Sequence, residues 1–129
     1  MDRTISYLKK LFHILTLLLI ILSLYPGNIL GFLISGNIRY EPQLTKDFLY
    51  ISSNHLYVYF LISVLGFFSY LRDRKFKLVA IYLFFLSIIL EVLHLVISER
   101  SFQILDLTSN ILGVLIAYIV VLIYKFWRK

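Results

Sequence analysis

The sequence predicts an all-α fold: a polytopic membrane protein with four transmembrane helices in a compact bundle, forming a single domain over residues 1–129. The hydrophobic fraction of 60% exceeds the about 45–50% of a typical soluble domain. A soluble fold of this length has too little interior to bury that much apolar surface, so the surplus must face lipid. The chain has no cysteine, which excludes a disulfide scaffold, a thiolate metal site and a cysteine nucleophile.

The apolar residues form four runs close to the roughly 20 residues that a helix needs to cross a bilayer, at about residues 7–25, 55–71, 78–97 and 104–124. Pro26 and Gly27 favour an end to the first helix. We therefore expect residues 28–35 to form a short surface or re-entrant segment; the alternative is a kinked helix that continues to Ile34. The N-terminus resembles a secretory signal, but no small-residue cleavage site follows, so we expect a retained anchor. His13 is expected to have a packing or interface role.

The basic residues indicate an orientation. Ten of the 13 Lys and Arg residues flank the apolar runs in three groups: Arg3, Lys9 and Lys10; Arg72, Arg74, Lys75 and Lys77; and Lys125, Arg128 and Lys129. The positive-inside rule then predicts that both termini are cytoplasmic, in the cytoplasmic (inner) membrane. The predicted outer segments carry three basic residues, Arg39, Lys46 and Arg100. Because the charges do not gather on one soluble surface, we expect no nucleic-acid partner.

Polar and ionisable side chains gather at the predicted outer ends of the second, third and fourth spans. Ionisable groups cost about 2.5–3.5 kcal/mol at mid-helix and usually face the bundle in a functional role. The candidates for a catalytic or ligand-binding cluster are His55, Glu91, His94, Arg100, Asp106 and Asn110.

Helical spacing places these side chains on three faces: Glu91, His94 and Ser98; Asp106, Asn110, Gly113 and Ala117; and His55, Tyr59, Ile62 and Gly66. The small residues Gly113 and Ala117 form a seam that lets two helices approach closely. The three faces are therefore expected to meet at one end of the bundle.

Each candidate also has an ordinary structural role open to it. Asp106 could cap the fourth helix, where an acidic group pairs with the helix dipole. Arg100 could be an interfacial anchor, and His55 could lie among the headgroups. A carboxylate inside a span needs a partner, and for Glu91 the natural partner is Arg100 or His94.

In order, these residues are His55, the stretch Glu91-Val92-Leu93-His94, and then Arg100, Asp106, Asn110 and Gly113. This pattern resembles the VanZ-like family of small four-span membrane proteins, named after a teicoplanin-resistance protein. In that family an E-x-x-Q element precedes an Arg in a short loop and then D-x-x-x-N-x-x-G. The resemblance covers about residues 53–118. Two departures are His94, where Gln is usual, and residues 51–52, where an acid and a Lys often precede the histidine.

The resemblance implies a bacterial envelope protein linked to glycopeptide-antibiotic resistance or surface polysaccharide. We hypothesise an outer-face pocket that binds or processes an anionic amphiphile, such as a lipid-linked glycan or a lipoglycopeptide. In that pocket Arg100 would clamp an anionic group, and Glu91 or His55 would move a proton. The alternative is a non-catalytic subunit that works with envelope-biosynthesis proteins; a transporter is a third class, which would have to oligomerise.

We expect no cofactor and no metal. His55, Glu91, His94 and Asp106 are plausible metal ligands, but the Gln that the resembling family carries in place of His94 is a poor zinc ligand. The lipid bilayer is the one partner that composition alone requires.

Overall fold

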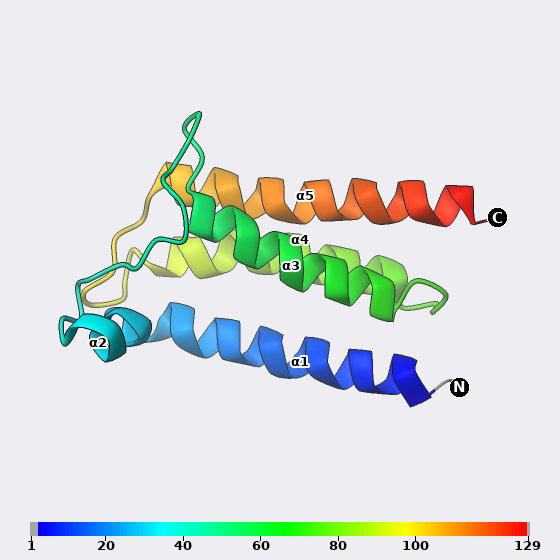
Figure 1. Cartoon of the computed structure of the whole chain (residues 1–129), viewed down its shortest axis with the longest axis horizontal. Helices are drawn as coiled ribbons and strands as arrows, with labels where there is room; N and C mark the ends of the chain where they lie inside the picture. The colour runs from blue at the N-terminus through cyan, green and yellow to red at the C-terminus, as the bar shows by residue number, and fades with distance from the viewer. Residues whose placement is uncertain (1–2, 129) are drawn as a thin grey trace.

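The computed structural model describes residues 3–128, which fold into five helices with no strand among them (Figure 1): α1 Arg3–Leu24, α2 Ile29–Ser35, α3 Ser53–Ser69, α4 Phe76–Leu93 and α5 Ile104–Trp127. The all-α fold class is confirmed. Within the described residues, α1, α4 and α5 are long and apolar enough to cross a membrane, whereas α3 has 17 residues and is shorter than the other three. A fourth span therefore stays a prediction.

The first span ends where Pro26 and Gly27 predicted. Gly27 has a φ of 100°, a left-handed conformation that a residue with a Cβ rarely adopts. Asn28 then caps a separate helix, because its side-chain Oδ1 accepts a hydrogen bond of 2.8 Å from the N–H of Gly31. The alternative of one kinked helix reaching Ile34 is wrong.

The third predicted span is too long at its C-terminal end. It was expected to reach Ile97, but α4 ends at Leu93 and His94 is its C-cap. The chain then makes tighter turns, in which the N–H groups of His94 and Leu95 bond to the carbonyls of Glu91 and Val92. Ser98 therefore does not continue the helical face of Glu91, and that part of the prediction is wrong.

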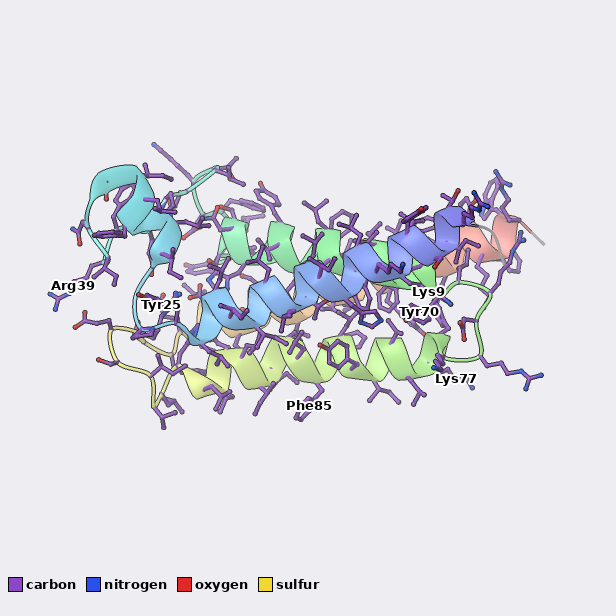
Figure 2. The ribbon with its side chains drawn as sticks, turned by 90° about the horizontal axis from the view of Figure 1, so that it is seen from below. Lys9, Tyr25, Arg39, Tyr70, Lys77 and Phe85 are labelled. Atoms are coloured by element: carbon purple, nitrogen blue, oxygen red, sulfur yellow. The ribbon has the colours of Figure 1, made fainter. Side chains whose placement is uncertain are left out.

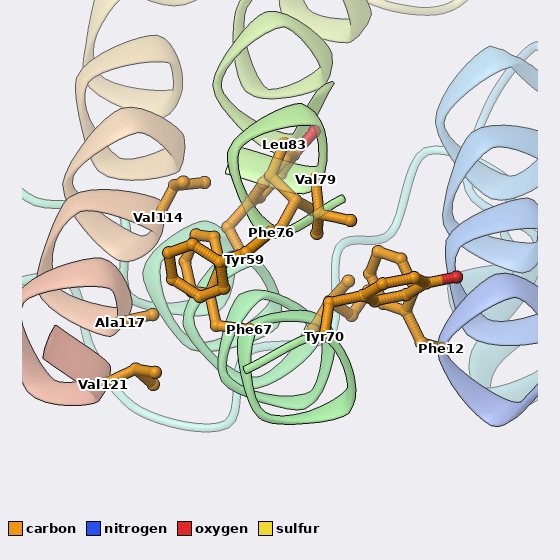
Figure 3. Packing of buried hydrophobic residues seen from close by; sticks show 11 residues of the cluster. Phe12, Tyr59, Phe67, Tyr70, Phe76, Val79, Leu83, Val114, Ala117 and Val121 are labelled. Atoms are coloured by element: carbon orange, nitrogen blue, oxygen red, sulfur yellow. The ribbon is translucent and has the colours of Figure 1, made fainter. Parts of the chain in front are cut away.

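The core lies where α3 packs between the other helices (Figure 3), with Tyr59 and Phe67 of α3 meeting Val114 and Val121 of α5. The predicted small-residue seam is present. A Cβ on Gly113 would lie 2.7 Å from the carbonyl oxygen of Leu56, so α3 and α5 approach to backbone contact there. This close approach brings the polar starts of α3 and α5 together.

Many large apolar side chains point away from the bundle. Ile14 of α1 is 62% exposed, and Ile81 and Phe85 of α4 are 66% and 62% exposed; Figure 2 shows Phe85 directed outward. Continuous apolar surface on three long helices is what a lipid environment requires. The outer surface of the bundle therefore supports insertion in a membrane.

The bundle has two unlike ends. Both ends of the described chain lie on the same side as the turn between α3 and α4 (Figure 1), so the described residues of the three basic groups gather there; we call this the basic end. The other end carries α2, the long loop at residues 36–52, and the loop between α4 and α5.

Candidate functional site

A cavity of about 430 Å³ opens at the end of the bundle opposite the basic end. Its lining combines apolar side chains with polar ones: Leu19, Ser23, Asn28, Leu30, Ile34, Glu41, Pro42, Gln43, Leu44, Asn54, His55, Val58, Tyr59, Leu90, Glu91, His94, Arg100 and Asn110. Five of the six predicted site residues line it. Asp106, the sixth, contacts His55 from the first turn of α5.

A hydrogen-bonded chain across three helices fixes His55. Asn110 is 1% exposed, and its Nδ2 donates to the carbonyl of Ser87 on α4 over 3.3 Å. The other amide atom of Asn110, Oδ1, can only accept and lies 2.9 Å from His55 Nδ1. His55 Nδ1 therefore carries a proton and donates it to Asn110 Oδ1. The tautomer and the ring orientation follow from this contact, and Nε2 is left to face Asp106 Oδ2 at 3.5 Å.

Asp106 is therefore more than a helix cap. The N-cap of α5 is Gln103, which makes no side-chain capping bond, and Asp106 lies one turn further along. Its carboxylate keeps the favourable position near the positive end of the helix dipole while it faces His55.

Glu91 is almost completely buried, with 1% of its surface exposed. Its Oε1 accepts a hydrogen bond of 3.1 Å from the backbone N–H of Gln103. His94 Nδ1 lies 3.3 Å from Oε2, but no hydrogen bond in the described residues reaches that oxygen. Of the two partners expected for Glu91, the structure therefore selects His94.

Arg100 instead contacts the end of α1. Its Nη2 donates to the carbonyl of Leu22 at 2.8 Å and its Nε to that of Tyr25 at 3.3 Å. These carbonyls lack helical partners, so the guanidinium closes the C-terminal end of the helix. Burial lowers the pKa of Arg100, whereas the charges of Glu41 and Glu91 raise it. The guanidinium has five N–H donors, so others remain for a group in the cavity.

Over nearly the whole chain, residues 8–127, the sequence matches the model of the VanZ/LLP1 family. The chain belongs to the VanZ/LLP1 family. No curated protein and no solved structure matches it. The family membership confirms the resemblance found in the sequence, and it agrees with apolar helices long enough to span a membrane.

The cavity of this VanZ/LLP1 chain is also lined by residues that the sequence did not single out, Glu41 and Asn54. Asn54 accepts a bond from the N–H of Leu44 and donates to the carbonyl of Pro42, which holds the long loop over the cavity. The loop has no periodicity that indicates how it folds back onto the site. The one available signal in the sequence is an Asn in the first turn of a helix after a Pro-containing loop.

His13 lies outside the cavity lining and contacts Tyr70, the C-cap of α3. Its Nε2 is 2.8 Å from the hydroxyl of Tyr70, and its ring packs against Phe12. The packing role expected for His13 is confirmed.

Proposed function

We propose that this VanZ/LLP1 protein binds or processes an anionic amphiphile at the outer face of the bacterial cytoplasmic membrane. The candidate ligands are a lipid-linked glycan of surface-polysaccharide or envelope synthesis and a lipoglycopeptide antibiotic such as teicoplanin. The observation that carries the proposal is the cavity, which combines an apolar wall with a guanidinium at one end of a membrane bundle.

The cavity lining matches both halves of such a ligand. Leu30, Ile34 and Leu44 offer an apolar surface for an acyl or polyprenyl tail, and Arg100 offers charge-assisted hydrogen bonds to a phosphate or carboxylate. A volume of about 430 Å³ lies within the roughly 300–1,000 Å³ of small-molecule sites, so a headgroup and the first part of a tail would fit.

The orientation is part of the proposal. We place both termini in the cytoplasm because the described residues of the three basic groups gather at the basic end. The cavity, at the opposite end, would then lie under the outer headgroups, where lipid-linked glycans and lipoglycopeptides are both presented.

If the pocket carries out a reaction, His55 is the proton-transfer group that the contacts favour. Asn110 holds Nδ1–H, so Nε2 faces Asp106 and is free to accept a proton in its neutral form. Asp106 would stabilise the imidazolium that results. Glu91, buried and bonded to the Gln103 N–H, is the second candidate.

Binding measurements with three probes test the proposal: a polyprenyl phosphate, the uncharged polyprenol of the same length, and teicoplanin. We expect purified protein in detergent to bind the phosphate more tightly than the alcohol. Arg100→Gln should weaken phosphate binding about 10- to 100-fold, because a hydrogen bond to a charged group contributes about 1.5–3 kcal/mol. Binding of the alcohol should not change.

Arg39→Gln is the matched control, because Arg39 is an exposed arginine outside the cavity that pairs with Glu99. Equal affinity for phosphate and alcohol in the wild type, or unchanged phosphate binding in Arg100→Gln, would contradict the proposal. Tighter binding of teicoplanin than of the phosphate would favour the lipoglycopeptide over the lipid-linked glycan.

The second candidate is a non-catalytic subunit of an envelope-biosynthesis assembly. It is favoured by polar contacts that join different helices, such as His55 with Asn110 and His94 with the carbonyl of Ser23. In this function Glu91→Gln and Arg100→Gln would reduce the amount of protein in the membrane or release a co-purifying partner. Quantifying the variants in membranes beside their probe binding separates the two functions.

A further inference from the structure

Three side chains from three different helices converge at the cavity end of the bundle. His55 of α3, Glu91 of α4 and Asp106 of α5 each offer one ligand atom, and these atoms all lie within 4.8 Å of one another. We propose that His55, Glu91 and Asp106 form a binding site for a divalent transition metal, with Zn²⁺ and Mn²⁺ as the best candidates.

His55 is prepared to bind a metal through Nε2. Its Nδ1–H is held by Asn110 Oδ1, whose amide is itself fixed by the carbonyl of Ser87. Metal-binding histidines have this arrangement, in which the second ring nitrogen donates to an acceptor that sets the tautomer and the ring orientation. The lone pair of Nε2 therefore points to the side where Asp106 lies.

Glu91 supplies a second observation that favours a cation here. Oε2 is buried and accepts no hydrogen bond from the described residues, and its nearest partner is His94 Nδ1 in an ion-pair contact of 3.3 Å; Oε1 is held by the N–H of Gln103. A buried carboxylate oxygen without a hydrogen bond is costly. A metal ion would satisfy Oε2, and a neutral His94 would keep the bond from its other ring nitrogen to the carbonyl of Ser23.

The geometry suits a small ion. Bonds of about 2.0–2.1 Å in a tetrahedral zinc site place two ligand atoms about 3.4 Å apart, close to the 3.5 Å between His55 Nε2 and Asp106 Oδ2. The other separations, within 4.8 Å, would close by small rotations of the side chains. One imidazole and two carboxylates suit Zn²⁺ or Mn²⁺, and three protein ligands leave a coordination position open.

That open position would face the cavity, which both His55 and Glu91 line. The cavity also contains the carboxylate of Glu41, which weakens the attraction of Arg100 for an anion. A divalent ion would add to that attraction and could bind a phosphate directly. This link to an anionic ligand rests on the proposed function; the metal site itself does not.

Metal uptake by the full chain tests the site. Protein purified in detergent and stripped with EDTA should bind one Zn²⁺ or Mn²⁺ per chain at micromolar free metal, measured by elemental analysis, and its melting temperature should rise. His55→Gln and Asp106→Asn should each weaken binding at least about tenfold, because even an outer-shell partner contributes about 10- to 100-fold. Glu41→Gln, a carboxylate of the same cavity outside the three, is the matched control and should bind like the wild type.

No stoichiometric uptake by the wild type would overturn the proposal without any variant. Unchanged binding in both ligand variants would overturn it as well. If the variants fail to fold, X-ray absorption of Zn²⁺ bound to the wild type decides: one imidazole with oxygen ligands supports the site, and two or more imidazoles contradict it. Metal uptake without amphiphile binding would leave this site standing and refute only the proposed function.

Discussion

The two ends of the bundle use the same kinds of side chain in different ways. At the basic end Lys9 pairs with Asp73 at 2.5 Å and His13 contacts the Tyr70 hydroxyl at 2.8 Å, each with part of its surface in solvent. At the cavity end Glu91 is buried, and one of its oxygens is reached by no hydrogen bond from the described residues.

The contrast separates residues that anchor the ends of helices from residues that we propose to bind a ligand. At the basic end Lys9 and Asp73 pair with each other and keep part of their surface exposed, so they fix the ends of two helical segments at little cost. A histidine and two carboxylates gathered around a cavity are weak evidence for stability, because apolar residues of similar size often stabilise a fold equally well. The arrangement supports the ligand-binding function that we propose.

The largest expected effect comes from the seam that brings the cavity residues together. In Gly113→Ala the added Cβ would lie 2.7 Å from the Leu56 carbonyl, and a backbone atom cannot move aside easily. We expect the free energy of unfolding to fall by about 3 kcal/mol, the upper range for overpacking. Denaturation of the purified protein in detergent measures this loss.

Gly66→Ala is the counterpart toward the basic end, because its Cβ would meet the ring of Phe12, a side chain. We expect a loss of about 1 kcal/mol there. Equal losses of unfolding free energy in Gly113→Ala and Gly66→Ala would contradict the prediction that the α3–α5 contact is more rigid than the contact of α3 with Phe12.

A smaller effect is expected from the hydrogen bonds that orient His55. Asn110→Ala leaves the His55 N–H and the Ser87 carbonyl without their partner, which should cost about 1–3 kcal/mol. Tyr70→Phe removes one hydroxyl from His13 at the basic end and should cost about 1 kcal/mol. The same unfolding measurement compares the two variants. A larger loss of unfolding free energy in Tyr70→Phe than in Asn110→Ala would contradict the contrast between the two ends of the bundle.

The smallest effect is a pH dependence at the basic end. Lys9 donates a hydrogen bond to Asp73 and, with the backbone N–H of Lys75, lowers the pKa of the Asp73 carboxyl. Because the folded-state pKa lies below the ordinary value of about 3.9, the ionised Asp73 stabilises the fold at pH values above about 3.9. This stabilisation is lost as the pH falls through the folded-state pKa. The melting temperature of the wild type should therefore exceed that of Asp73→Asn at pH 6 and converge with it in stronger acid. A difference that persists or grows in acid would refute this contact.

Periodicity in the sequence predicted much of the fold and of the site. The apolar runs predicted the four long helices, and the pair Pro26 and Gly27 predicted the end of α1. Helical spacing predicted the close approach of two helices at Gly113. Costly polar residues within those runs identified four of the residues that line the cavity, and the turn between the last two runs supplied a fifth, Arg100.

What the sequence did not predict depends on long-range contacts. The end of α4 was placed too late because Leu95, Val96 and Ile97 are as apolar as the helix before them. The choice of His94 over Arg100 as partner of Glu91 depends on the end of α1, whose carbonyls hold the guanidinium. His55, Glu91 and Asp106 come from three helices, so their grouping without His94 could be recognised only once the positions of these helices were known.

Cysteine labelling in intact cells tests most directly the central claim that the cavity end faces outward. The natural chain contains no cysteine, so single variants are read without background. Tyr50→Cys, at an 88% exposed position in the long loop at the cavity end, should react with a membrane-impermeant maleimide. Arg74→Cys, in the basic turn between α3 and α4, should react only after the membrane is permeabilised. The reverse pattern would place the cavity on the cytoplasmic side and contradict the account.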